Sequence, residues 1–283
     1  MFLVTGATGN VGSELTALLC AGGEPTRALV QTPEKADALR GYDCEIAIGD
    51  FDAAESLDEA LRGVTALYLL TPAGPHQFEQ ERAVVDAAVR AGDVRVVKQA
   101  VMGYDAGIGR LGDSHAASIA YLRDSGLRHT VLAPNSFMQN LLTAASLVQQ
   151  QNMLALPGGD AAVSHVDARD VAAVGAHVLA SEGHEGATYV ITGPEALTYA
   201  EVADAMSQVL EREIRYVDVP PDEARRAMTD SGMPEWYADA LGELMAAYRQ
   251  GKAATVTDEV EKATGRPARP LTEFLSDHRS AFA

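Results

Sequence analysis

Short apolar runs alternate with longer amphipathic stretches through the first half of the chain. The short runs have the length of strands, and the stretches between them have the 3.6-residue period typical of helices. The expected strands are Phe2–Thr5, Thr26–Val30, Cys44–Ile48, Ala66–Leu70, Val94–Val101 and His129–Ala133. The expected helices are Val11–Ala21, Pro33–Arg40, Ser56–Leu61, Gln77–Ala91 and Ser114–Asp124. Because the strands are nearly continuous apolar runs, helices should cover both faces of a parallel, doubly wound sheet.

The regular alternation loosens after about residue 134. Helices are expected at Phe137–Gln150, from Asp167 to about Ala180, and at Ala200–Leu210, Pro221–Asp230 and Pro234–Gln250, with strands at Gly186–Ile191 and Ile214–Val219. No internal repeat or long linker separates the two halves. The chain is therefore expected to form a large α/β domain over residues 1–150 and a small C-terminal α+β lobe over residues 151–283, interleaved with the first domain.

Composition narrows the range of partners. The 283 residues are 47% apolar, which suffices for a proper core, and 40 acidic residues against 22 basic ones give a formal charge of −18. Such a surface repels phosphate backbones and anionic lipid, so nucleic acid and membrane surfaces are not expected partners. Cys20 and Cys44 can form neither a disulfide framework nor a zinc ligand set, so no metal is expected. With no basic or cleavable N-terminal segment, a cytoplasmic location is expected.

Three glycines follow the first strand and open the first helix, at Gly6, Gly9 and Gly12. One glycine forms the tight turn, another lets a pyrophosphate approach the backbone, and the last lets the helix pack closely on the strand. The helix N-terminus then offers unpaired N–H groups to the phosphates. In a chain that continues strand–helix–strand, this pattern predicts a Rossmann-type dinucleotide-binding domain. The loop residues expected at the cofactor are Gly6, Thr8, Gly9, Asn10 and Val11.

The GxxGxxG spacing in TGATGNVG, residues 5–12, resembles the extended and atypical short-chain dehydrogenases/reductases. The segments that carry a narrower resemblance are Ala28–Ala36, Gly49–Asp52, Ser125–Leu127, Ala133–Asn140, Thr198–Ala203 and Thr264–Pro267. Their order and spacing resemble the NmrA-like group from residue 2 to about residue 275. That family includes NAD(P)H-dependent quinone, azo-dye and triphenylmethane reductases, and also redox-sensing regulators that bind the dinucleotide without turning it over.

The resemblance places the adenosine end of the cofactor at the ends of the second and third strands. An acid at the end of the second strand would favour the ribose hydroxyl of NAD, and a basic group the 2′-phosphate of NADP. Gln31 stands there, with Thr32 and Lys35 after it to meet a phosphate, so NADP(H) is expected over NAD(H). Asp50 and Phe51 are expected at the adenine.

The carboxyl ends of the remaining strands complete the expected site, because ligands bind there in open α/β sheets. Further cofactor contacts are expected from Leu70, Thr71, Pro72, Gln99 and Asn135. Contacts with the substrate are expected from Met102, Phe137, Met138, Asn140 and Trp236.

The YxxxK pair of ordinary short-chain dehydrogenases is missing: Tyr104 is followed four residues later by Ile108, and Tyr121 by Ser125. Reductases related to isoflavone reductase place a lysine near the start of the helix before the sixth strand, and the resemblance puts His115 at or beside that place. A histidine can donate a proton near neutral pH. Tyr104, in the loop after the fifth strand, is the other candidate.

The expected activity is hydride transfer from NAD(P)H to a small, apolar, conjugated acceptor such as a quinone, azo, imine, iminium or triarylmethyl compound. An acceptor that is already electrophilic needs little general acid, which fits the missing YxxxK. A non-catalytic NADP(H) sensor remains an alternative. An isomerase, epimerase or dehydratase is a further one, against which the short lobe and the missing YxxxK count. The expected partner is a small-molecule substrate, and a homodimer is compatible with the sequence.

Overall fold

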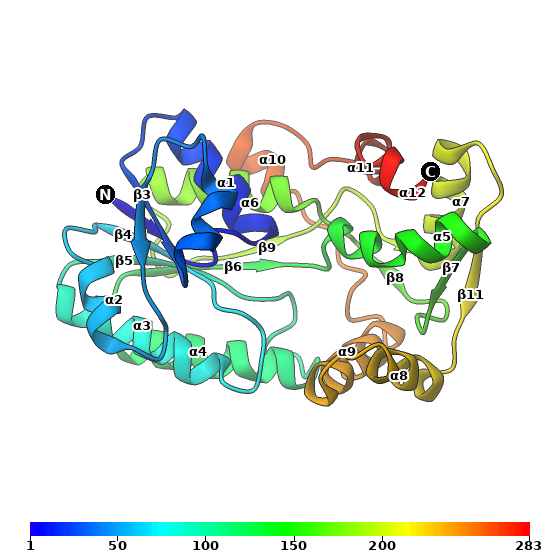
Figure 1. Cartoon of the computed structure of the whole chain (residues 1–283), viewed down its shortest axis with the longest axis horizontal. Coiled ribbons are helices and arrows are strands. Elements are labelled where there is room, and N and C mark those ends of the chain that lie inside the picture. The colour runs from blue at the N-terminus through cyan, green and yellow to red at the C-terminus, as the bar shows by residue number, and fades with distance from the viewer. The chain divides into compact units, whose positions relative to one another are not determined.

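A seven-stranded parallel sheet is the largest sheet of the computed structural model, which describes residues 1–283 (Figure 1). The strands are β1 (Phe2–Val4), β2 (Thr26–Val30), β3 (Glu45–Ile48), β4 (Ala66–Leu69), β5 (Arg95–Gln99), β6 (His129–Pro134) and β9 (Thr188–Ile191). They are ordered β3-β2-β1-β4-β5-β6-β9, so the direction of winding reverses between β1 and β4. This order confirms the predicted Rossmann-type sheet, and the reversal marks the crevice where such sheets bind ligands.

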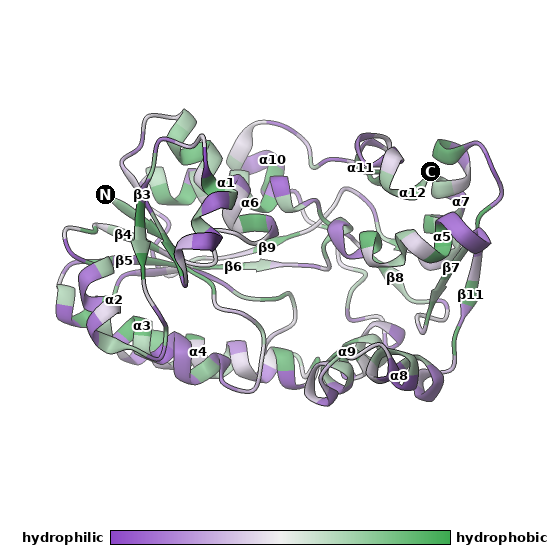
Figure 2. Ribbon diagram, in the orientation of Figure 1, coloured by the Kyte–Doolittle hydropathy of each residue, from purple (hydrophilic) through white to green (hydrophobic).

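Helices cover both faces of this sheet, as the apolar strands predict. On one face α1 (Asn10–Ala21) packs against α6 (Ala168–Ala180), and on the other α2 (Ala54–Ala60) packs against α3 (Gln77–Ala91), with α4 (Arg110–Asp124) beside them (Figure 1). Figure 2 shows the strands mostly in the apolar colour and the helices mixed. The predicted helix at 33–40 is a 3₁₀ helix, η1 (Pro33–Leu39), whose start is capped by Thr32.

The second half of the chain contains shorter elements. They are η2 (Met138–Ala144), α5 (Ala145–Gln151), β7 (Met153–Leu156), β8 (Ala162–Val163), β10 (Leu197–Thr198), α7 (Tyr199–Leu210), β11 (Arg215–Asp218), α8 (Pro221–Asp230), α9 (Glu235–Arg249), α10 (Glu259–Thr264), α11 (Leu271–Asp277) and α12 (Arg279–Phe282). The predicted helix at 137–150 is split between η2 and α5. Two small sheets pair β7 with β11 in parallel and β8 with β10 antiparallel. Thr198 is the N-cap of α7 and forms a capping box with Glu201.

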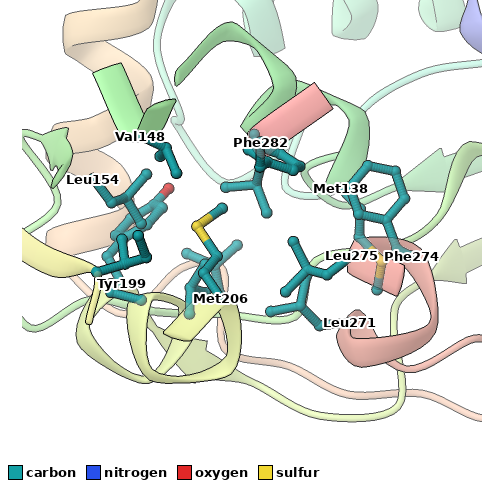
Figure 3. Close-up of a cluster of buried hydrophobic side chains, with 14 of the residues drawn as sticks. Met138, Val148, Leu154, Tyr199, Met206, Leu271, Phe274, Leu275 and Phe282 are labelled. Atoms are coloured by element: carbon teal, nitrogen blue, oxygen red, sulfur yellow. The ribbon is translucent and has the colours of Figure 1, made fainter. Parts of the chain in front are cut away.

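One apolar cluster holds these shorter elements together (Figure 3). Its members include Met138, Val148, Leu154, Tyr199, Met206, Leu271, Phe274, Leu275 and Phe282. Helices α11 and α12 contribute Phe274 and Phe282, neither of which is exposed. The last residues of the chain are therefore part of this core.

Two compact units share the chain alternately. The first comprises Met1–Ala100, Ser114–Ala133 and Ala168–Tyr189, and the second comprises Val101–Asp113, Pro134–Asp167 and Val190–Ala283. This division differs from the expected boundary at residue 150. Residues 168–189 join the first unit because α6 packs on α1. No helix in the chain is both long and apolar enough to cross a membrane.

Candidate functional site

Two glycines of the loop after β1 are required by the chain's own packing. Gly6 has a φ of +63°, which side chains rarely adopt. A Cβ on Gly12 would lie less than 3.0 Å from the carbonyl oxygen of Gly6 and 2.9 Å from the Cα of Ala7. The Thr5 hydroxyl anchors the loop on the neighbouring strand, donating to the Leu70 carbonyl and accepting from the Leu70 amide, each at 2.8 Å. These contacts fix the turn at the crevice between β1 and β4.

Gly9 is less constrained by packing than Gly12. Its Cβ would meet only one backbone oxygen, at 3.3 Å, and the residue is exposed. Gly9 is the N-cap of α1, whose first turn carries no capping side chain and no acidic residue, and its carbonyl accepts the first intrahelical bond from Ser13. The first amides of α1 therefore have no helical partner, and the helix dipole favours an anion in front of them. Thr8 and Asn10 beside them are exposed, whereas Val11 is buried and offers only its backbone.

The ends of β2 and β3 carry a chain of hydrogen-bonded polar groups. Lys35 Nζ donates to Gln31 Oε1 at 3.0 Å, and Gln31 Nε2 donates to Asp50 Oδ2 at 3.4 Å. The Thr32 hydroxyl accepts from the Lys35 amide. The ammonium of Lys35 stands at one end of this hydrogen-bonded row and the carboxylate of Asp50 at the other. The row therefore offers a partner to a phosphate and another to a ribose hydroxyl. Phe51 packs half-buried against the core of the first unit.

Two predicted cofactor residues at the ends of β4 and β5 turn inward. The Thr71 hydroxyl is buried and lies 3.3 Å from Glu81 Oε1, to which it donates. The Gln99 side chain is buried as well, and its Oε1 accepts from the Tyr68 hydroxyl. Pro72, by contrast, is exposed. The side chains of Thr71 and Gln99 thus belong to the interior, and their backbone is what remains at the sheet edge.

The inward-facing groups of the first unit surround a buried lysine. Lys98 on β5 and Glu81 on α3 are both 0% exposed and form an ion pair at 2.8 Å. Lys98 Nζ also donates to the Gln99 carbonyl and, at 3.1 Å, to Nδ1 of His115 on α4. The Gln77 amide nitrogen lies 3.4 Å from both ring nitrogens of His115. Each of the three ammonium hydrogens of Lys98 therefore has its own acceptor.

This cluster determines the protonation of His115. Burial and the charge of Lys98 hold the pKa of His115 well below its usual value, so the ring is neutral at pH 7. Lys98 can only donate, so Nδ1 accepts and the ring proton is assigned to Nε2. The sequence left open which form of His115 would donate a proton, and the lowered pKa makes the neutral ring the form available at pH 7. Burial also lowers the pKa of Lys98, and Glu81 opposes that shift.

Sequence reasoning located Lys98 at the end of the fifth strand but gave no role to it, to Glu81 or to Gln77. The available signal was a charged residue inside the apolar run 94–101, because a buried charge requires a partner. Nothing local in the sequence indicates that the partner lies at residue 81.

The second unit contains the predicted residues that follow β6. Asn135 is buried with both ends of its amide engaged, donating to Ser164 Oγ at 2.7 Å and accepting from the next backbone amide at 2.8 Å. Met102 and Met138 lie in the apolar core of this unit. Phe137 is half-buried, and Asn140 is exposed. Phe137 and Asn140 are thus the accessible members of this set.

Tyr104 and Trp236 lie on a loop and a helix that are tied together within the second unit. Tyr104 is half-buried in the loop before α4. Arg110 at the end of that loop donates two hydrogen bonds to Glu243 Oε1 on α9, at 2.6 and 3.0 Å, and its backbone amide donates to Oε2. The Arg110 guanidinium also lies 6.0 Å from the centroid of the Trp236 ring. The loop is therefore held against α9.

A second buried histidine lies in the same unit. His165 is 5% exposed, and neither ring nitrogen has a hydrogen-bond partner. Its ring meets that of Tyr199 edge-on, with centroids 5.7 Å apart. Burial lowers the pKa of His165 to about 4, so this ring is also neutral at pH 7. No group of three or more side chains in the chain could hold a metal ion.

Comparison with known proteins places the chain among nicotinamide-dependent reductases. Residues 1–276 match the model of the NmrA-like family. An NAD(P)H azoreductase of Xenophilus azovorans is 40% identical over 289 aligned residues, covering 100% of this chain and 99% of the relative. The NADPH-dependent quinone oxidoreductase of Escherichia coli, in complex with NADPH, superimposes with a TM-score of 0.90 at 26% identity, over 98% of this chain and 99% of that one. A triphenylmethane reductase of Citrobacter sp. complexed with NADP(H) gives 0.88 at 25% identity, with the same coverage.

Proposed function

Because the chain belongs to the NmrA-like family, we propose that it is an NAD(P)H-dependent reductase of the atypical short-chain type. Its acceptor is a small, apolar, conjugated molecule, a quinone or an azo compound. The observation that carries the proposal is Gly9, an exposed glycine before an uncapped helix, where a Cβ would make a single close contact, at 3.3 Å from the Gly6 oxygen. A dinucleotide pyrophosphate needs both that space and those amides.

Different residues of the protein bind different parts of the cofactor and the acceptor. The loop Gly6–Gly12 holds the pyrophosphate, and Lys35 and Asp50 meet the adenosine end, with NADP(H) preferred. When bound, the cofactor supplies the hydride. His115 supplies a proton to the reduced acceptor from Nε2. Phe137, Asn140 and Trp236 contact the acceptor, while Met102 and Met138 support them from the core.

Mixing the protein with NADPH and a panel of quinones and azo dyes, and following the absorbance of the nicotinamide, tests this function. Oxidation of NADPH that depends on the acceptor is the expected result. Binding of NADPH with no turnover of any acceptor would instead favour a non-catalytic NADP(H) sensor.

Gly9→Val tests the cofactor site separately. The valine makes one close backbone contact, at 3.3 Å from the Gly6 oxygen, and fills the space above the helix amides, so we expect a folded chain with no measurable NADPH binding by calorimetry. Gly74→Val is the control, because a Cβ there meets nothing within 4 Å and the position lies outside the loop. Tight binding of NADPH by Gly9→Val would reject the assignment.

A cytoplasmic location and a homodimer are retained from the sequence as proposals. Fractionation of the native host and the sedimentation of the purified chain test them directly.

A further inference from the structure

Lys98 makes a hydrogen bond to His115 that a purely structural ion pair with Glu81 would not require. An ion pair is complete with the Glu81 carboxylate at 2.8 Å, and the Gln99 carbonyl takes a second hydrogen. The remaining hydrogen meets Nδ1 of His115 at 3.1 Å. Lys98 and Glu81 have no exposure to water. Among the groups that Lys98 contacts, His115 is the most exposed at 7%, and Gln99, whose carbonyl cannot release a proton, is exposed by 4%.

We propose that Lys98 is the internal proton source that recharges His115 during acceptor reduction. This inference rests on the proposed reductase function. A dihydronicotinamide held by the loop Gly6–Gly12 would supply a hydride to the acceptor and would itself be oxidised, so that the reduced acceptor would carry a new lone pair on a nitrogen or oxygen. The His115 Nε2–H bond breaks and its proton goes to that lone pair, while a proton from Lys98 Nζ forms the new Nδ1–H bond.

The imidazole therefore stays neutral and passes from one tautomer to the other, and Lys98 becomes a neutral amine. A proton from water at Nε2, with return of the Nδ1 proton to Lys98, restores the starting state. Burial favours this exchange, since the low dielectric lowers the pKa of Lys98 and disfavours an imidazolium. Gln77 of α3 and Lys98 of β5 contact His115, and Glu81 of α3, which accepts from Lys98 and from Thr71, lies behind them; of these groups Lys98 and Glu81 are charged.

Two acceptors with different proton demands separate this role from a structural one. An azo dye needs a proton after hydride addition, whereas a cationic triarylmethane dye becomes neutral by taking hydride alone. Lys98→Met should lower kcat/KM for the azo dye by about 10²-fold or more, the usual size of general-acid assistance. The value for the triarylmethane dye should stay unchanged. An equal loss on both dyes, or no loss on either, overturns the proposal.

A double-mutant cycle tests whether Lys98 acts through His115. In the His115→Ala background, Lys98→Met should cause no further loss on the azo dye, because the relay is already broken. Independent, additive losses would overturn the relay. In Lys98→Met alone, His115 must take its proton directly from solvent as an imidazolium, so azo reduction should fall as pH rises through neutrality, where the wild type is flat.

Lys98→Met leaves Glu81 buried without its partner and risks unfolding the chain. Lys98→Met/Glu81→Leu replaces the whole pair with apolar side chains and should show the same selective loss on the azo dye, with NADPH binding intact.

The ¹⁵N spectrum of His115 in the cofactor-free protein gives a readout independent of activity: we expect the proton on Nε2, and a proton on Nδ1 would overturn the proposal. If the wild-type protein reduced no dye, the reductase function itself would be rejected. The spectrum would still show whether His115 Nδ1 accepts the hydrogen bond from Lys98.

Discussion

The Cα of Gly12 faces the carbonyl oxygen of Gly6 so closely that a Cβ on Gly12 would stand less than 3.0 Å from that oxygen. The first helix of the sheet is thus seated directly on the turn that precedes it. The two glycines make this approach for the chain's own packing, whereas a Cβ on Gly9 would stand farther from the same oxygen, at 3.3 Å. Loop stability and cofactor binding can therefore be separated by substitution.

Gly12→Ala should destabilise the protein by about 1–3 kcal/mol or more, because the backbone oxygen cannot give way as a flexible side chain would. Gly9→Ala should cost no more than about 1 kcal/mol, the scale of a helix N-cap change, and should weaken NADPH binding instead. Urea unfolding and calorimetry measure the two effects. If Gly12→Ala unfolds at the same urea concentration as the wild type, the close approach is not what demands this glycine.

Discrimination between NADPH and NADH should be modest. The 2′-phosphate meets an exposed Lys35, and such a contact contributes about 1 kcal/mol or less, which corresponds to a preference of at most about tenfold. Lys35→Ala should remove this preference while leaving the KM for NADH unchanged. Lys262→Ala, at an exposed lysine of α10, serves as the matched charge control. Steady-state kinetics with each cofactor measure the ratio. A preference beyond about a thousandfold in either direction would contradict this account of the pocket.

His115→Ala should lower kcat/KM by about 10²–10⁴-fold for an azo or imine acceptor, since the product anion loses its proton donor. For a cationic triarylmethane dye the loss should stay under about tenfold, because no proton is needed. NADPH affinity should be nearly unchanged. Tyr104→Phe is the control, as Tyr104 is the other candidate donor. A silent His115→Ala with a severe Tyr104→Phe would reverse the two assignments.

Acid should destabilise the protein through His165. In the unfolded chain this histidine titrates near pH 6.5, whereas burial lowers its pKa in the folded chain to about 4, so between these values the unfolded state binds the extra proton. Stability is therefore lost as pH falls from about 6.5 toward 4, by up to about 3 kcal/mol. His165→Leu should lose less stability over this range, as measured by urea unfolding at each pH. Parallel curves for the two proteins would contradict the buried, neutral histidine.

The sheet and its helices could be predicted because their signals are local. Gln77–Ala91 and Thr26–Val30 have the bounds that periodicity indicates, since each buries a face set by its own side chains. The strands β8 and β10 were not predicted, because two residues each are too few to show a period. Their pairing, Ala162 with Thr198, depends on how the 35 intervening residues fold. Helix α12, of four residues, is equally too short to show a period.

The candidate site divides in the same way. The glycine spacing could be read because all three residues lie within one turn and the helix that follows it. The protonation of His115 could not be read, because it depends on Lys98 from β5 and Glu81 from α3, which are brought together only by the sheet. Burial, which decides the pKa of each of these groups, is a property of the fold and not of any one segment.

The alternation of the two units along the chain limits how this protein can diversify. The backbone passes between the units five times, and the apolar core of the second unit draws on residues from Met102 to Phe282. No single crossover in a gene could exchange that unit alone, because a break near residue 100 that moves all of it also moves residues 114–133 and 168–189 of the first unit. New acceptor specificities in such a scaffold must therefore arise by substitution or loop insertion at existing positions, rather than by shuffling of whole domains.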